Sequence, residues 1–496
     1  MIKPPLPAFA AAPVAGVGLV LAGLLTALSG RYGFHRDELY FLAAGDRPGW
    51  GYVDQPPLTP LIARAATTLF GESPAGLRVA STLAAVASAV VVSLLARELN
   101  ASRIGQVIAA CSAAASGLLL VLGHMVSTTT VDLLAWLVIC WLVLRLLRTS
   151  DGRWWLAIGA AVGIAILNKY LVVLLLLALF VALLVTGPRR VLRTWWLPAG
   201  AAVAFVLALP NLWWQASNGW PQLTVAGGIS ADDGVENRIM FVPLQILQLS
   251  PLLVPVWVAG FVRLWRTPEL RWARSMALAY PFLCALVLVL GGKAYYALPV
   301  AVVLMAAGGE SVAAWLRRGR AAVRTSIAGV GLVAAVATSI VVALPVLPPQ
   351  ALAVVNAINK EQGEQVGWPS LVRAAAEGWS RIPEGQRDRS VVFTQNYGQA
   401  GAIELYGPDH GLPAPYSSHM SYADWGPPPD SADGPVLFVR QKDNRAAERF
   451  FTDCQQVATV DNGVGVENEE QNAAIVLCAG AVAPWSELWP DLRHFY

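Results

Sequence analysis

The sequence predicts a polytopic α-helical membrane protein with a small α/β domain at its C-terminal end. Of its 496 residues, 56% are hydrophobic and only 14% are charged. A soluble domain carries about 25% charged residues, so lipid is expected to surround most of this chain. After "LPVLPPQ" (Leu344 to Gln350) the composition becomes polar. The formal net charge of +3 is too small to indicate a nucleic-acid partner.

Eleven apolar stretches approach the length of about 20 residues that a spanning helix needs. They cover residues 9–29, 76–96, 104–122, 127–147, 154–168, 170–186, 195–215, 240–262, 275–291, 295–315 and 325–346. Sixteen arginines lie in five alternate connections: Arg97, Arg103, Arg145, Arg148, Arg153, Arg189, Arg190, Arg193, Arg263, Arg266, Arg271, Arg274, Arg317, Arg318, Arg320 and Arg324. Basic connections favour the cytoplasmic side of a membrane. We therefore expect the N-terminus inside and, with about eleven spans, the C-terminus outside.

Two domains follow from this pattern, a membrane domain over residues 1–348 and an extracytoplasmic α/β domain over residues 349–496. In the second domain, strand-like runs over 390–395, 435–440 and 472–478 alternate with helical stretches near 351–378 and 444–452. Cys454 and Cys478 lie in this domain, and an oxidising compartment would let them form a disulfide. The other three cysteines fall in predicted spans, where packing is the simpler role.

The first outward loop, residues 30–75, is unusually rich in charge. It opens with "RYGFHRDELYFLAAG" (Arg31 to Gly45), in which Asp37 and Glu38 are adjacent, and Asp54 follows in "YVDQPPL". After Pro57 an amphipathic helical pattern is expected to lie along the membrane surface. The acidic pair has two interpretations, charges that stabilise a solvated loop or a helix N-terminus, and groups that perform chemistry on a ligand.

Two lysines occupy positions where the charge pattern predicts few basic residues. The chain has 30 arginines and only five lysines, and both Lys169 and Lys293 are predicted at outer ends of spans. Long side chains that reach toward the interface give a structural explanation. Two of only five lysines at outer ends are better explained by an anion held there. Acidic and basic groups on one side of the membrane predict an acid–base reaction on a lipid-linked anion.

Several motifs resemble one known family. They are "RDELYFLAAG…GWGYVDQPPLTPLIARAATTLFG" in the loop, "STTTVDLLAWL" (Ser127 to Leu137), "LNKYLVVLLL" (Leu167 to Leu176), "NLWWQASNGWPQL" (Asn211 to Leu223), "KAYYALPVAVVLMAAG" (Lys293 to Gly308) and the tail "NYGQAGAIELYGPDHGLPAPYSSHMSYADWGP" (Asn396 to Pro427). The loop resembles the first periplasmic loop of bacterial family-39 glycosyltransferases. These enzymes have the GT-C fold, as do protein O-mannosyltransferases and lipid A aminoarabinose transferases. The resemblance extends over nearly the whole chain and says little about the acceptor.

The resemblance implies an inverting sugar transfer from a polyprenyl-phosphate donor at the outer leaflet. Asp37 matches the acidic position of the family's first loop and would be the general base for the acceptor hydroxyl. Glu38 would orient the acceptor or the base. A hydrophobic groove for the prenyl tail should run between spans and open beside the phosphate.

The leaving group in such a transfer is a lipid phosphate, and cations are needed to stabilise the charge that develops on it. Lys169 and Lys293 are the main candidates, with Arg78 as a weaker third. Tyr295 and Tyr296 are candidates to donate hydrogen bonds to the phosphate, although tyrosines at a membrane edge are more often part of an aromatic belt.

The chain departs from the family pattern before the Pro-Pro pair, where many relatives carry Lys and this chain carries Gln55. A neutral amide donates hydrogen bonds to a phosphate and supplies no charge. Asp54 lies where some relatives bind a metal, with His124 as a second weak candidate. A lone Asp and a lone His do not define a metal site. No cofactor is therefore assigned, and a divalent metal stays an open alternative.

Three further residues are weaker candidates for binding the acceptor or sugar. Asp54 is one of them, Asp132 follows "STTT" near the start of a predicted span, and Trp220 ends "NLWWQASNGW". Stabilisation of a helix N-terminus is the simpler role for Asp132, and an aromatic belt is the simpler role for Trp220. Within the tail, Tyr397, Glu404 and Tyr406 either help to cover the site or serve packing.

The sequence thus predicts a glycosyltransferase of the cytoplasmic membrane, with its active site and C-terminal domain outside. Its expected partners are a polyprenyl-phosphate sugar, membrane lipids, and a lipid, polysaccharide or protein acceptor. A protein O-mannosyltransferase is the nearer alternative. A lipid-linked-sugar transporter or a structural envelope protein is the alternative from another class. Transporters usually carry ionisable groups inside their spans, whereas the charges here gather at the outer ends.

Overall fold

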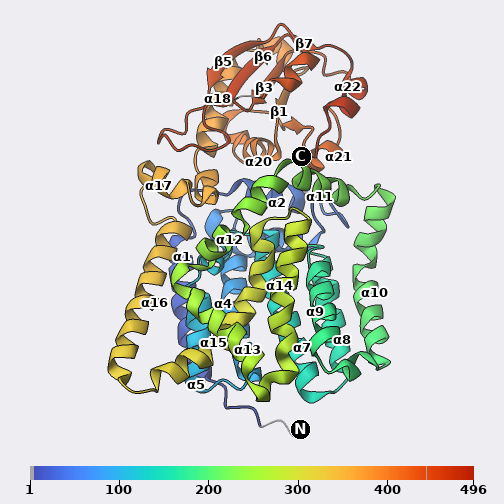
Figure 1. Cartoon of the computed structure of the whole chain (residues 1–496). Coiled ribbons are helices and arrows are strands. Elements are labelled where there is room, and N and C mark those ends of the chain that lie inside the picture. Colours follow the sequence, from blue (N-terminus) through green and yellow to red (C-terminus); the bar gives the residue numbers. More distant parts are fainter. Residues whose placement is uncertain (1–4, 443, 496) are drawn as a thin grey trace.

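The computed structural model describes residues 5–442 and 444–495. Figure 1 shows a bundle of long helices with the C-terminal domain seated on one end and the N-terminus at the opposite end. The bundle and its connections contain α1 (Ala11–Leu28), α2 (Arg36–Asp46), α3 (Leu58–Phe70), α4 (Pro74–Glu98), α5 (Arg103–Ala114), α6 (Gly117–His124), α7 (Thr128–Thr149), α8 (Trp154–Ile166), α9 (Val172–Thr186), α10 (Trp196–Ser217), α11 (Pro221–Asp232), α12 (Gly234–Leu249), α13 (Val254–Arg266), α14 (Arg274–Val289), η4 (Ala294–Ala297), α15 (Leu298–Leu316) and α16 (Ala321–Ala343).

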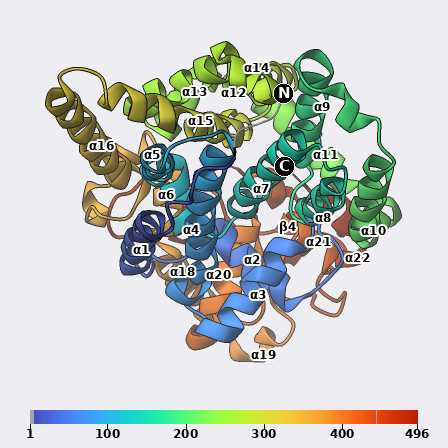
Figure 2. The same ribbon diagram turned by 90° about the horizontal axis from the view of Figure 1, so that it is seen from below.

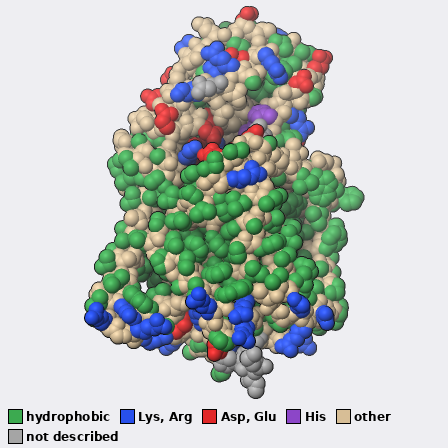
Figure 3. All heavy atoms as spheres, in the orientation of Figure 1, with side chains coloured by type: hydrophobic (Ala, Val, Ile, Leu, Met, Phe, Trp, Pro, Cys, Tyr) green, Lys and Arg blue, Asp and Glu red, His purple; other side chains and the backbone are tan. Residues whose placement is uncertain are grey.

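The chain is a membrane protein. Within the described residues, seven helices are long and apolar enough to cross a membrane, or up to nine if each of two bent helix pairs forms one span. Figure 3 shows their hydrophobic side chains as a band around the middle of the bundle. Helix α15 is the most buried of the seven, whereas α16 and α10 are largely exposed and lie at opposite edges of the bundle in Figure 2. Their exposed valines and leucines suit a lipid environment.

Two of the predicted spans are bent at a break in the helix. Residues 104–122 form α5 and α6, which meet at 60° because the Ser116 side chain caps a new helix. Residues 240–262 form α12 and a second helical segment at 81°. There Ser250 adopts a left-handed φ of 92° and Pro251 has no N–H to continue the helix. Helices α8 and α9, with 13 and 15 residues, are shorter than a straight span.

Arginines gather at the end of the bundle opposite the C-terminal domain (Figure 3). Arg145 pairs with Glu98 at 2.8 Å, and Arg148 donates to the Glu98 carbonyl at 2.8 Å. Arg263 donates to the Leu99 carbonyl at 2.7 Å. The arginine-rich connections therefore meet at one end of the helices and tie α4, α7 and α13 together.

The C-terminal domain is built around a five-stranded mixed sheet in the order β2-β1-β3-β6-β5, with β4 and β7 forming a separate pair. Strand β1 pairs in parallel with β2 and β3, and β6 lies antiparallel to β3 and β5. Its elements are α17 (Ala353–Asn356), η6 (Lys360–Gln365), α18 (Trp368–Ser380), α19 (Glu384–Arg387), β1 (Val391–Thr394), α20 (Tyr397–Tyr406), β2 (Tyr416–Ser417), α21 (Ser421–Asp424), β3 (Val436–Arg440), β4 (Phe451–Thr452), β5 (Gln455–Thr459), β6 (Ala474–Cys478), β7 (Gly480–Ala481) and α22 (Trp485–Leu492).

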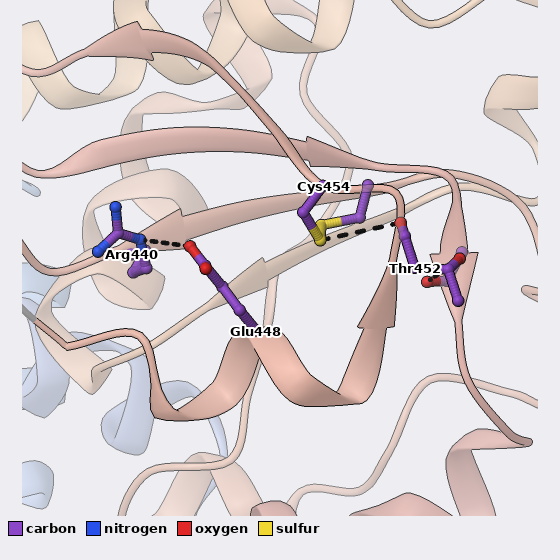
Figure 4. The surroundings of a disulfide bond; sticks show 6 residues. Arg440, Glu448, Thr452 and Cys454 are labelled. Carbon is purple, nitrogen blue, oxygen red and sulfur yellow. Dashed lines mark hydrogen bonds and ion pairs between the residues drawn. A yellow bond between two sulfur atoms is a disulfide. The ribbon is translucent and has the colours of Figure 1, made fainter.

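A disulfide joins Cys454 to Cys478 and links the start of β5 to the end of β6. Figure 4 shows it close to Thr452, with the Arg440–Glu448 ion pair nearby. The guanidinium of Arg440 contacts Glu448 at 2.9 Å. The predicted helix near 351–378 is divided into short segments before α18, because Gly367 takes a φ of 100° directly before Trp368.

The first loop and the C-terminal domain share one hydrophobic core. Residues of α2, α3 and α4 pack in the same buried cluster as residues of α18 and α20. Helix α20 approaches α2 so closely that a Cβ on Gly401 would lie 2.9 Å from the Cβ of Leu39. A Cβ on Gly398 would lie 2.5 Å from the Arg36 side chain. These contacts hold the outer domain against the beginning of the first loop.

A buried carboxyl group anchors the start of α20. Asn396 caps the helix and donates to Glu470 at 2.8 Å, and Gln399 donates to the other Glu470 oxygen at 2.6 Å. Burial raises the pKa of Glu470 from 4.5 to about 7, against the lowering effect of these two hydrogen bonds. Because the pKa is higher in the folded state, the contribution of Glu470 to stability is complete below about pH 4.5. It is lost as the pH rises through about 7.

We expect Glu470→Gln to remove much of this pH dependence. The free energy of unfolding of the wild type should fall by about 1–3 kcal/mol more than that of the variant between pH 5 and 8. Urea unfolding of the detergent-solubilised chain measures the difference. The exposed residue Glu467, changed to Gln, is the matched control and should keep the pH dependence of the wild type. Equal pH profiles for wild type and Glu470→Gln would contradict this assignment.

Candidate active site

A buried ion pair lies at the base of the candidate site. Arg78 of α4 contacts Glu38 of α2 through two hydrogen bonds, Nε to Oε1 at 3.0 Å and Nη2 to Oε2 at 2.7 Å. Both side chains are completely buried, with 0% exposure. Burying two charges is costly, and a two-point contact of this kind is the geometry that offsets the cost.

The remaining hydrogen-bonding groups of the pair are also engaged. Arg78 donates to the carbonyl oxygens of Ser29 and Gly33, each at 2.7 Å. The Glu38 oxygens accept from the backbone N–H groups of His35 and Val126 at 2.8 and 2.9 Å. Arg78 was expected to contact a donor phosphate, and Glu38 to orient the acceptor or the base. Their burial and bonding form a buried clamp between the first loop and α4.

Asp37 takes the opposite orientation. It lies in the first turn of α2, where His35 is the N-cap and accepts from the Asp37 backbone N–H at 3.1 Å. Its carboxylate is 35% exposed and accepts a hydrogen bond from the Tyr397 hydroxyl at 2.8 Å. Burial and the Asp37 charge raise the pKa of Tyr397 well above its usual range, so the hydroxyl keeps its proton and donates. Asp37 thus faces the junction between the first loop and the C-terminal domain.

A second carboxylate, Asp54, belongs to the same junction. It accepts from the Tyr40 hydroxyl at 2.6 Å, and the Tyr40 oxygen in turn accepts from the Ser421 backbone N–H at 3.3 Å. The Tyr40 ring lies 4.8 Å from that of Tyr397, centroid to centroid. Burial raises the pKa of Asp54 to about 6, the Tyr40 hydrogen bond lowers it in part, and the Asp37 charge adds to the rise. Asp37 and Asp54 therefore act on each other electrostatically.

Lys169 lies among aromatic and hydroxyl groups. Its ammonium lies 5.5 Å from the Tyr295 ring centroid and 5.4 Å from that of Tyr296, and it donates to the Thr129 hydroxyl at 3.1 Å. These contacts hold the cation with partners that carry no full negative charge. The charge of Lys169 also acts on the nearby Asp132 carboxylate.

Lys293 and Asp132, the other two expected ligands in this region, have different partners from those of Lys169. Lys293 is 40% exposed and lies 3.9 Å from Asp233, so a surface carboxylate already partners it. Asp132 is buried and accepts from the Trp136 indole at 2.9 Å. Ser127, not Asp132, caps the start of α7. Asp132 is thus buried close enough to Lys169 for the two charges to interact.

Gln55 was expected to contact the donor phosphate in place of a lysine. Its side chain is almost fully buried, and neither its amide nitrogen nor its amide oxygen has a partner among the described residues. Unsatisfied buried amides are costly, so such a group is suited to a ligand that supplies the missing hydrogen bonds. The backbone of this loop is held by α10, where Asn211 donates to the Trp50 carbonyl at 2.7 Å.

Asp54 and His124, the two weak candidates for binding a metal, contact different partners. Asp54 bonds to Tyr40, whereas His124 lies 3.3 Å from the guanidinium of Arg78. A cation next to His124 would be repelled by Arg78. Within residues 5–442 and 444–495, no group of three or more His, Cys, Asp or Glu side chains is arranged to hold a metal. Trp220 is 40% exposed and precedes the first residue of α11.

An apolar groove of about 320 Å³ runs between α3, α4 and α7. Its walls include Ile62, Leu83, Val126, Thr130 and Leu134. The groove lies beside the buried clamp, because the Val126 backbone donates to Glu38. It also lies beside the Lys169 region, because Thr130 follows the Thr129 that Lys169 contacts.

The comparisons with known proteins point to one fold. Residues 54–214 match the family model described as dolichyl-phosphate-mannose-protein mannosyltransferase. ArnT from Cupriavidus metallidurans bound to undecaprenyl phosphate is similar, with 16% identity and a TM-score of 0.58 over 93% of this chain and 97% of that chain. The chain has the GT-C fold.

A second solved structure agrees. The arabinofuranosyltransferase AftD from Mycobacteria shares 14% identity and a TM-score of 0.53 over 94% of this chain and 40% of that chain. No curated protein matches the chain in sequence. The resemblance indicated by the sequence motifs is thus confirmed at the level of the GT-C fold.

Sequence reasoning missed the residues that join this GT-C bundle to its C-terminal domain. His35 contacts Glu361 at 2.9 Å, and Arg36 pairs with Glu469 while its guanidinium lies 5.4 Å from the Tyr397 ring centroid. The only signal for them was their place beside Asp37 in a charged loop. Their acidic partners lie more than 300 residues away, so no local pattern revealed the pairs.

We expect Arg78→Lys to destabilise the protein strongly. Lysine cannot reproduce the two-point contact, and it leaves the buried Glu38 carboxylate poorly paired. Urea unfolding in detergent should show a loss of about 3–5 kcal/mol in the free energy of unfolding. Arg64→Lys, which alters an exposed pair with Asp46, is the control and should cost no more than about 1 kcal/mol. Unchanged stability of Arg78→Lys together with weaker binding of a polyprenyl phosphate would restore Arg78 as a phosphate ligand.

Proposed function

We propose that this chain is an inverting glycosyltransferase that moves a sugar from a polyprenyl-phosphate donor to an acceptor hydroxyl. The observation that carries the proposal is the position of Asp37. It is a 35%-exposed carboxylate at the meeting point of the first loop and the C-terminal domain. Its charge acts on Tyr295, one of the two rings that contact Lys169. Gln55, a buried amide without a partner among the described residues, follows Asp54 of the same junction. The GT-C fold agrees with this reaction class.

In the proposed reaction, Asp37 is the general base. The acceptor oxygen attacks the anomeric carbon of the donor sugar while its proton passes to the Asp37 carboxylate. The bond between the anomeric carbon and the phosphate oxygen breaks, and polyprenyl phosphate leaves. Attack from the face opposite the leaving group inverts the anomeric centre. The hydrogen bond from Tyr397 fixes one Asp37 oxygen and leaves the other for the acceptor.

Lys169 is proposed to stabilise the charge on the leaving phosphate. The Thr129 hydroxyl and the rings of Tyr295 and Tyr296 hold its ammonium without neutralising it. Gln55 would supply an amide N–H to the phosphate, which would satisfy its unpartnered nitrogen. In this proposal Lys293 attracts the donor from the surface, and Lys169 acts during the reaction.

The groove between α3, α4 and α7 is proposed to hold the first part of the prenyl tail. Its lining is almost entirely apolar, and several of its residues, such as the 62%-exposed Leu83, suit contact with lipid chains. The similarity to ArnT, which binds undecaprenyl phosphate in its solved structure, supports a polyprenyl carrier. The tail would then enter from the bilayer while the sugar projects toward Asp37.

The proposed setting is the cytoplasmic membrane, with Asp37 and the C-terminal domain on the extracytoplasmic side. The arginine-rich end opposite the C-terminal domain supports this orientation, and the Cys454–Cys478 disulfide suits an oxidising compartment. A protein acceptor is the second candidate, favoured by the match of residues 54–214 to the mannosyltransferase model. A lipid or polysaccharide acceptor ranks first because the C-terminal domain does not resemble the membrane-spanning end of protein O-mannosyltransferases.

The central test compares wild type with Asp37→Asn. Both purified proteins are incubated with a panel of radiolabelled polyprenyl-phosphate sugars and membrane extract from a deletion strain. Loss of the base should lower transfer by about 10²–10⁴-fold, while donor binding stays within twofold of wild type. Asp46→Asn, at the other end of the same helix, is the matched control and should transfer normally. Undiminished transfer by Asp37→Asn would refute the mechanism, and failure of both proteins to bind any donor would refute the reaction class.

Lys169→Gln should lower the turnover number much more than it weakens donor binding. Removing a preorganised charge from the leaving group typically costs about 10²–10³-fold in rate. Steady-state kinetics with the active donor separates kcat from KM, and Lys169→Arg should retain part of the rate. The exposed Lys360→Gln is the control. If Lys169→Gln behaves as wild type while Lys293→Gln loses turnover, the roles of the two lysines are the reverse of those proposed.

A further inference from the structure

A cavity of about 570 Å³ lies outside the junction that holds Asp37 and Lys169. It is formed where the turn between α10 and α11 meets α21, α22 and the C-terminal tail. Figure 1 shows α11 and α21 where the bundle meets the C-terminal domain, with α22 above them at the side of that domain. Its lining includes Asn218, Thr224, Asp424, Trp489, Arg493 and Phe495. Its volume falls within the range of small-ligand sites, about 300–1,000 Å³.

The lining combines aromatic surfaces with charged groups that neutralise each other. Asp424 and Arg493 form an ion pair, so the cavity presents hydrogen-bonding groups without net charge. The Trp489 indole is fixed by donating to the Ala423 carbonyl at 2.9 Å. The Arg493 guanidinium lies 5.3 Å from the Phe495 ring centroid. A sugar ring has an apolar C–H face and polar hydroxyl edges, which match aromatic surfaces flanked by such groups.

A continuous row of rings connects this cavity to the proposed base. His494, between Arg493 and Phe495, stacks on His419 with centroids 4.6 Å apart. The His419 ring lies 5.1 Å from that of Tyr397, which donates to Asp37. The cavity is also one short helix away from Asp54, because Ser421 at the start of α21 accepts from the Val53 backbone N–H at 3.0 Å.

The position of the cavity suits a glycan that approaches along the membrane. Helix α10 exposes Trp213 at the same end, and α11 exposes Leu223 beside the cavity-lining Thr224. Large exposed apolar side chains of this kind mark the lipid boundary. An acceptor attached to, or lying on, the membrane surface can therefore reach the cavity.

We propose that this cavity binds a neutral saccharide unit of the acceptor, an inference that rests on the proposed glycosyltransferase function. The ion pair of Asp424 and Arg493 and the aromatic walls recognise the sugar already present on the acceptor. The ring contacts among His494, His419 and Tyr397 link the wall of the cavity to Asp37. The acceptor is therefore a glycan or glycolipid whose existing sugar lies in the cavity.

The test measures saccharide binding to the full chain in detergent without any polyprenyl donor. The probes are neutral tetrasaccharides, one each of mannose, galactose and arabinose. Saturation-transfer NMR measures their binding. Thr224→Trp and Asn218→Trp each fill the cavity from an exposed position and should weaken binding of the recognised tetrasaccharide at least tenfold. Leu223→Trp adds the same bulk at a neighbouring residue outside the lining and should bind as wild type.

The same tetrasaccharide should compete with the acceptor in the transfer assay of the wild type. Failure of every tetrasaccharide to bind, or wild-type binding by both Trp variants, would overturn the site and leave the proposed transfer reaction untouched. Binding without competition would overturn its assignment to the acceptor. Because binding is measured without donor, loss of the proposed function would instead appear as absence of transfer by a wild-type protein that still binds saccharide.

Discussion

The buried pair of Glu38 and Arg78 is the constraint on which the rest of the site depends. Two unscreened charges in the interior are tolerable only because each is almost completely hydrogen-bonded, to its partner and to the backbone of Ser29, Gly33, His35 and Val126. The pair fixes the rotation of α2. Successive residues on a helix point about 100° apart, so burying Glu38 turns the neighbouring Asp37 toward the C-terminal domain.

The C-terminal domain completes the environment of Asp37. Helix α20 comes close to α2 because Gly398 and Gly401 carry no Cβ at the contact. This approach places Tyr397 against Asp37, and ion pairs of His35 and Arg36 with Glu361 and Glu469 surround the contact. Residues of α18 and α20 are buried in one core with residues of the first loop, and Glu470 is hydrogen-bonded to the start of α20. The outer domain is therefore a structural part of the site.

The basic groups near the site divide into three kinds according to their partners. Arg78 is buried against a carboxylate and carbonyl oxygens, and it serves the fold. Lys293 lies at the surface beside Asp233. Lys169 alone of these three is held by hydroxyl and aromatic groups, which position a charge without cancelling it. A site that stabilises a developing negative charge needs this last kind of partner, since a neutralised cation has little electrostatic effect left to offer.

The membrane bundle, the C-terminal α/β domain and the charged first loop could be predicted from the sequence, because hydropathy, charge asymmetry and strand patterns are local properties of the chain. The sequence also indicated Asp37, in the charged first loop, and Lys169, at the predicted outer end of a span, as candidate site residues. Which of the two adjacent carboxylates is buried could not be predicted from residue type, because Glu38 is buried by its contact with Arg78, 40 residues further along the chain. The contact of Tyr397 with Asp37 and the burial of Arg78 likewise depend on partners distant in sequence, whose packing no local pattern encodes.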